Sequence, residues 1–147
     1  MDKLKLHRTV IQQLQDSLHG LQQHMQQLIE DAANDSKSSV GDKHETTRAQ
    51  VHLEQEKLSQ AISNIEQQLQ VMERLSVETS DIVRSGSVVE TSIGWFYIAV
   101  PNLIIDFEGN KLRCISSGSP LGKLLMQKQT SERVVMNGSD IIIRGIW

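Results

Sequence analysis

The sequence predicts an α+β protein in which an antiparallel coiled-coil hairpin of two α-helices precedes a small antiparallel β-sheet domain with one short helix. Three observations predict this class. No proline occurs before Pro101, so no proline interrupts long helices in the first two thirds of the chain. Apolar residues there recur at helical spacing, whereas the remainder consists of short β-rich runs separated by turn sequences. We therefore expect a hairpin over residues 1–78 and a sheet domain over residues 84–147.

The first helical run carries a heptad seam. From Ile11 onward its apolar residues alternate at steps of three and four, a period that favours a left-handed coiled coil. Gly20 lies inside this run and costs about 1 kcal/mol relative to alanine in a helix interior. The predicted seam consists of Leu4, Ile11, Leu14, Leu18, Leu21, Met25, Leu28 and Ala32.

A second seam follows after a polar connector. Each helical run spans about 30 residues, which corresponds to roughly 45 Å of helix. Two similar seams joined by a short connector are expected to fold back on each other, with residues 34–47 at the tip. Pairing of the helices between two chains is the alternative. The second seam consists of Val51, Leu58, Ile62, Ile65, Leu69 and Met72.

The last part of the chain reads as a small sheet domain. Six short β-rich runs alternate with the turn signals "PN", "EGN", "SSGSP" and "NG". Asn137-Gly138 between two apolar runs predicts a tight hairpin. The stretch "SPLGKLLMQK" predicts a short helix with Ser119 as N-cap and Pro120 at its first position. Aromatic residues are expected to supply part of the core, namely Trp95, Phe96, Tyr97, Phe107 and Trp147.

Composition and charge exclude several classes of protein. The chain has 147 residues, with 15 Lys and Arg against 18 Asp and Glu, so it lacks the basic excess of a protein that binds nucleic acid by itself. No apolar stretch approaches the roughly 20 residues of a membrane helix, and the N-terminus turns polar too soon for a signal peptide. A single cysteine, Cys114, allows no internal disulfide. We expect a cytoplasmic protein.

The predicted tip contains two carboxylates at helical spacing, Asp42 and Glu45, within "GDKHE". One interpretation is a capping arrangement, in which Asp42 is the N-cap of the second helix and Glu45 is its N3 residue. The other is a site for a divalent cation, since Mg²⁺ prefers oxygen ligands and often takes only one or two carboxylates. The two roles are compatible, because the start of a helix would hold the two carboxylates rigidly for a cation. His44 between the acids also permits a zinc site, the weakest of these interpretations.

Two segments resemble the Gre family of bacterial transcript-cleavage factors. "ISSGSPLGKLLMQK" is similar to the family's "IS-x-x-SP" segment before a short helix, and "GDKHE" matches its "GD-x-x-E" tip. The order of parts agrees with the family over nearly the whole chain. The resemblance implies an FKBP-like sheet domain without isomerase activity, which docks on RNA polymerase at its secondary channel. The implied docking residues lie at Ser117, Ser119, Pro120, Leu121 and Lys123.

The resemblance also implies how such a factor acts. Asp42 and Glu45 would help to hold a second Mg²⁺ shared with the polymerase, which then hydrolyses the RNA of a backtracked complex. The factor would be no enzyme of its own, would meet nucleic acid only within the transcription complex, and would be a monomer or weak dimer. Arg48 and Ala49 stand where family members often have an acidic residue and an aromatic one. A regulator of polymerase that does not stimulate cleavage, or a coiled-coil protein-interaction module, therefore remains an alternative.

Overall fold

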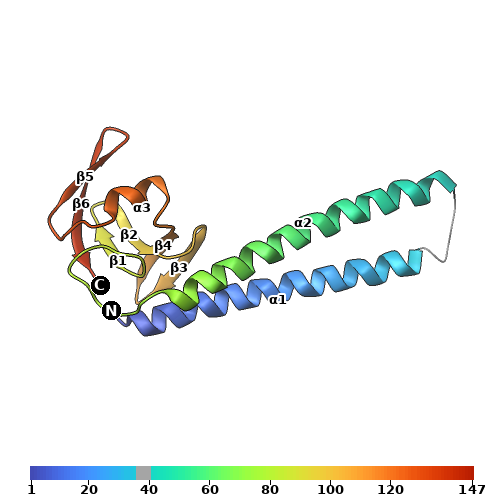
Figure 1. Ribbon diagram of the computed structural model, residues 1–147, viewed down its shortest axis with the longest axis horizontal. Coiled ribbons are helices and arrows are strands. Elements are labelled where there is room, and N and C mark those ends of the chain that lie inside the picture. The colour runs from blue at the N-terminus through green and yellow to red at the C-terminus, as the bar shows by residue number, and fades with distance from the viewer. Residues whose placement is uncertain (36–40) are drawn as a thin grey trace. The chain divides into compact units, whose positions relative to one another are not determined.

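The computed structural model describes the backbone of residues 1–35 and 41–147, and the side chains other than those of residues 35–44 (Figure 1). Two long helices, α1 (Lys3–Asp35) and α2 (Gly41–Arg74), precede a six-stranded sheet with one short helix, α3 (Pro120–Leu125). The predicted α+β class is thus confirmed. The chain divides into two compact units. Gln12–Leu69 forms one, and Met1–Ile11 together with Gln70–Trp147 forms the other. We call them the hairpin unit and the sheet unit.

In the hairpin unit, α1 from Gln12 onward and α2 up to Leu69 lie side by side in opposite directions (Figure 1). Leu14 and Leu58 are buried, with 2% and 6% of their surface exposed, and the other seam residues within the unit are half-buried. The glutamines between them are mostly exposed, so the heptad spacing identified the contact face correctly. Of the predicted tip 34–47, residues 36–40 lie outside the described residues, and helix occupies the positions on both sides of them.

The beginning of α1 belongs to the sheet unit and buries a different face from the one predicted. Leu4, assigned to the seam by spacing, is 45% exposed, whereas Leu6 and Val10 are fully buried. The reason is that this part of α1 packs on the sheet. His7 Nδ1 lies 3.1 Å from the hydroxyl of Tyr97, and Lys5 Nζ lies 5.9 Å from the centre of the Phe107 ring.

The six predicted strands are all present: β1 (Val88–Thr91), β2 (Gly94–Ile98), β3 (Leu103–Phe107), β4 (Asn110–Ile115), β5 (Arg133–Met136) and β6 (Ser139–Ile146). Their spatial order is β3-β4-β2-β1-β6-β5. Most neighbours are antiparallel, but β2 and β4 pair in parallel, with Trp95 opposite Leu112 and Tyr97 opposite Cys114. The expected antiparallel sheet is thus confirmed for four of the five strand pairs, and the pairing of β2 with β4 is the exception.

The predicted tight hairpin joins β5 to β6. Asn137 and Gly138 both have positive φ, 52° and 77°, as a two-residue turn of the type favoured in hairpins requires. Met136 pairs with Ser139 on either side of this turn. A similar pair, Glu108 and Gly109, joins β3 to β4.

The sheet has apolar side chains on both faces. Buried residues on one face, including Val89, Ile98 and Ile143, pack together with Leu125 of α3. Tyr97 and Phe107 lie on the other face, against the first turns of α1. Of the aromatic residues predicted for the core, Phe96, Tyr97 and Phe107 are buried. Trp95 and Trp147 are half-buried and stack on each other, with ring centres 5.1 Å apart.

Candidate functional site

The predicted acidic tip falls at the beginning of α2. This helix starts at Gly41, so Asp42 is its second residue and does not precede the helix as an N-cap residue would. The side chain of Asp42 lies outside the described part of the chain. Glu45 lies one turn further along and is exposed. Residues three apart on a helix share a face, so the backbone places Asp42 and Glu45 on adjacent positions of one surface.

The residues present fit a divalent cation only as an incomplete ligand set. Two carboxylates suit Mg²⁺, which commonly keeps several waters and takes further ligands from phosphates. Among the residues that the structure describes, no group of three or more His, Cys, Asp or Glu side chains could hold a metal ion. Arg48 is exposed three residues after Glu45, hence on the neighbouring helix position, and its charge opposes a cation there.

The hairpin unit is acidic. Residues 12–69 contain 4 Lys and Arg against 9 Asp and Glu, a net charge of −5. Residues 1–11 and 70–147 contain 11 against 9, a net charge of +2. No Lys or Arg occurs between Arg8 and Lys37, so most of α1 offers no cation to a nucleic-acid backbone. Direct binding of RNA along α1 is therefore disfavoured by charge.

The predicted docking segment forms a tightly capped turn before α3. Ser119 is the N-cap residue, and its hydroxyl accepts a hydrogen bond from Gly122 N at 3.0 Å. The same hydroxyl donates to the carbonyl oxygen of Ser116 at 2.8 Å. Pro120 occupies the first turn, as the sequence predicted. The cap thereby ties the end of β4 to the start of the helix.

Gly122 is required by the packing of this turn. A Cβ atom built on it would collide with the carbonyl oxygen of Ser116 and lie 2.9 Å from Ser119 Oγ. Gly118, in the same loop, has open space at the corresponding position. The glycine inside α3 therefore allows the close approach of the helix to the preceding loop.

The five predicted docking residues divide between the fold and the surface. Leu121 packs against the core, and Ser119 is engaged in the cap. Ser117 is half-buried, whereas Pro120 and Lys123 are exposed. The structure thus brings the five together in one loop and helix, and it leaves Pro120 and Lys123 as the members most accessible to a partner.

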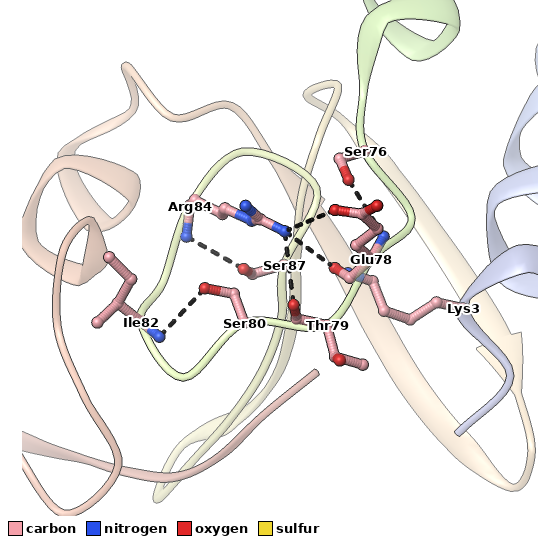
Figure 2. A network of polar contacts seen from close by, with 8 residues as sticks. All are labelled: Lys3, Ser76, Glu78, Thr79, Ser80, Ile82, Arg84 and Ser87. Carbon is pink, nitrogen blue, oxygen red and sulfur yellow. Dashed lines mark hydrogen bonds and ion pairs between the residues drawn. The ribbon is translucent and has the colours of Figure 1, made fainter.

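A polar network of the sheet unit was not foreseen from the sequence (Figure 2). Lys3 Nζ donates to the carbonyl oxygen of Glu78 at 2.7 Å. The guanidinium of Arg84 lies 3.5 Å from the carbonyl oxygens of Glu78 and Thr79, and 3.9 Å from the Glu78 carboxylate. The network fixes the segment between α2 and β1 and joins it to the start of α1. The contact between Lys3 and Glu78 joins residues 75 apart in the chain, so no local pattern signals it.

Four ionisable groups of the sheet unit have shifted pKa values. Burial, and next the charge of Cys114, raise the pKa of Tyr97. Burial, and next the charge of Arg84, lower the pKa of Lys3. Burial, followed by the charge of Lys3, lowers the pKa of His7, whose ring meets Tyr97. Burial raises the pKa of Cys114 to about 12, so this thiol remains protonated and unreactive at neutral pH. We assign these groups to the fold, because Lys3, His7 and Tyr97 make polar contacts within it and Cys114 is buried.

Comparison with known proteins gives only distant structural likeness. No family model matches the sequence, and no curated protein matches it. The solved structure of the transcription factor Gfh1 is 16% identical and covers 92% of each chain, with a TM-score of 0.37. GreA factor homolog 1 of Thermus thermophilus is 17% identical over 93% of this chain and 94% of its own, with a TM-score of 0.35. Thermus aquaticus Gfh1 is 16% identical over 92% of each chain, with a TM-score of 0.33. At these values the likeness assigns neither a family nor a function.

Proposed function

We propose that this protein is a transcription elongation factor that binds RNA polymerase in its secondary channel. The observation that carries the proposal is the pairing of two long helices with carboxylates at the start of the second, Asp42 and Glu45. The segment "ISSGSP" and the capped helix after it support the proposal independently, because they match the Gre-like motif in the sheet unit.

The two helices of the hairpin unit are long enough to extend into a channel. The part of α2 in the hairpin unit, Gly41–Leu69, has 29 residues and is therefore roughly 43 Å long. A paired helix of this length can enter a channel that would exclude a globular domain. The acidic charge of the hairpin unit implies that the channel surface it meets is at least partly basic.

In the proposed mechanism the factor completes another enzyme's active site. Glu45 is exposed and Asp42 shares its helix face, so both could contribute oxygen ligands while the polymerase and the RNA phosphates supply the others. A second Mg²⁺ held in this way would activate water and stabilise the leaving oxygen. Placement on a helix start keeps the two carboxylates at a fixed separation.

The proposed docking element is the capped turn with α3. Pro120 and Lys123 are exposed there, and Ser119 and Leu121 hold the turn in place. We propose that these residues, with Ser117, form the contact with the polymerase. In this role the network of Lys3, Glu78 and Arg84 is structural.

The test is cleavage of RNA in a stalled, backtracked RNA polymerase. Wild-type protein should bind the polymerase and accelerate cleavage, whereas Asp42→Asn and Glu45→Gln should bind normally and lose most of the stimulation. Glu56→Gln is the matched control, because it removes an exposed carboxylate from the same helix about four turns from its start. Thermal unfolding should be nearly unchanged in all three variants. Failure of the wild type to bind polymerase would refute the proposal.

The position of Arg48 favours a second candidate, a polymerase regulator that binds without stimulating cleavage. A cation beside Glu45 weakens the attraction of the tip for Mg²⁺. In that case the wild type binds but does not stimulate cleavage, and Arg48→Glu should raise the Mg²⁺-dependent activity of the complex. If Arg48→Glu and wild type behave alike, this charge does not explain the absence of cleavage.

A further inference from the structure

The strand β5 forms one end of the sheet and leaves an edge open. Within the described part of the chain it pairs only with β6 (Figure 1). An open edge presents backbone N–H and C=O groups that can pair with a strand of another chain. The edge is short and contains no proline, and its sequence is "RVVM".

The hydrogen-bond pattern shows which groups face outward. Ile143 N donates to the carbonyl oxygen of Glu132, so Glu132 faces β6. Ile142, which lies opposite Arg133, directs its N–H and C=O to Ser92 on its other side. Antiparallel pairs alternate between bonded and non-bonded. The backbone groups of Arg133 and Val135 therefore point to the open edge.

We propose that two copies of this protein associate by antiparallel pairing of their β5 strands. In the register that we infer, Arg133 of each copy lies opposite Val135 of the second copy. This arrangement uses the outward N–H and C=O groups of both residues in both copies. It also matches the faces of the sheet. Val134, which is buried, meets Val134 of the second copy on the face covered by α3, while Arg133 and Val135 stay on the open face.

The side chains of this edge are self-complementary. Val135 is 51% exposed, and Ile142, diagonal to it on β6, is 46% exposed, so pairing would cover apolar surface. The two Arg133 side chains become diagonal neighbours, but each is already paired with its own Asp140 at 3.1 Å. The ion pair removes most of the repulsion that would otherwise oppose the contact.

The opposite edge of the sheet, β3, lacks this compensation of charge. By the same alternation from its Glu108-Gly109 turn, Ile104 and Asp106 face outward there. Asp106 takes part in none of the ion pairs of the described residues. Pairing of two β3 edges would place two uncompensated carboxylates near each other, which is a typical protection of an edge strand. For this reason the proposal concerns β5 alone.

The experiment is sedimentation of the full chain over a range of concentrations. Wild type should show a monomer–dimer equilibrium. Val135→Pro removes an outward N–H without breaking the pairing of β5 with β6, and should weaken dimerisation between about tenfold and a hundredfold. Ile104→Pro is the matched control, since it makes the same change at an equally exposed position of the other edge, and should leave dimerisation unchanged.

Two results would overturn the proposal. One is a wild type that stays monomeric at its highest soluble concentration. The other is a dimer that a folded Val135→Pro does not weaken, or that Ile104→Pro weakens as much as Val135→Pro does. If circular dichroism shows that Val135→Pro is unfolded, the variant Asp140→Asn tests the proposed dimer instead. It leaves both Arg133 charges uncompensated, so it should weaken the dimer severalfold in low salt, and an unchanged dimer would refute the pairing. These outcomes are independent of whether the protein binds RNA polymerase.

Discussion

Replacement of Gly122 by alanine should destabilise the sheet unit by disrupting the turn before α3. The added Cβ meets the backbone carbonyl of Ser116, which cannot rotate away as a flexible side chain could. Forcing such contacts in a packed region costs roughly 1–3 kcal/mol. Displacement of the turn also strains the bond from Gly122 N to Ser119 Oγ, and a lost cap costs about 1 kcal/mol. The higher helix propensity of alanine than of glycine offsets up to about 1 kcal/mol of this destabilisation.

The net loss is therefore about 1–3 kcal/mol, which for a chain of this size lowers the melting temperature by roughly 3–12 °C. Differential scanning calorimetry of Gly122→Ala should show this fall. Gly118→Ala is the control, because its Cβ enters open space in the same loop and the melting temperature should change by only a degree or two. If the two variants have the same melting temperature, the close approach at Gly122 is not what fixes α3.

Two further predictions concern α1. Gly20→Ala should stabilise the hairpin unit by about 1 kcal/mol, measured by urea unfolding followed by circular dichroism, because the position is helical and has no atom within 4 Å of the new Cβ. A destabilised variant would show that the glycine has a packing role. Because the pKa of His7 is lowered in the folded protein, the unfolded state binds more protons below its ordinary value of 6.5, and stability should fall as the pH drops from that value. His7→Gln, which cannot titrate, should reduce this dependence, and a variant with the wild-type pH profile would assign it to other groups.

Local patterns predicted most elements of the fold. The six strands, the Asn137-Gly138 turn and the cap at Ser119 follow from residue types adjacent in the chain, and each lies where its sequence signal stands. The heptad seam is likewise a local pattern, and it holds throughout the hairpin unit, where its residues are buried or half-buried.

The errors occur where distant segments decide the outcome. Leu4 fits the heptad spacing, but the start of α1 lies on a sheet, so Leu6 and Val10 are buried instead. The parallel pairing of β2 and β4 depends on strand order, which local periodicity does not encode. The buried Lys3 was unexpected because its partner, the carbonyl oxygen of Glu78, is 75 residues away.

The sequence predicted which positions belong to the candidate site, but not the structural role or burial of each residue. Spacing placed Asp42 and Glu45 on one helix face, but the helix begins two residues earlier than the capping interpretation required. The motif around Ser119 predicted a docking segment, but the sequence did not distinguish the residues that hold the turn from the exposed Pro120 and Lys123. That distinction depends on burial, which the packing of α3 against the sheet determines.

The division of the chain makes the hairpin unit an insertion into the sheet unit. Residues 1–11 and 70–147 form one body, so the polypeptide leaves that body within one helix and re-enters it within another. Whole heptads could therefore be added to or removed from both helices without altering a single contact of the sheet. Evolution, or a designer, can change the reach of such a protein independently of the domain that carries it.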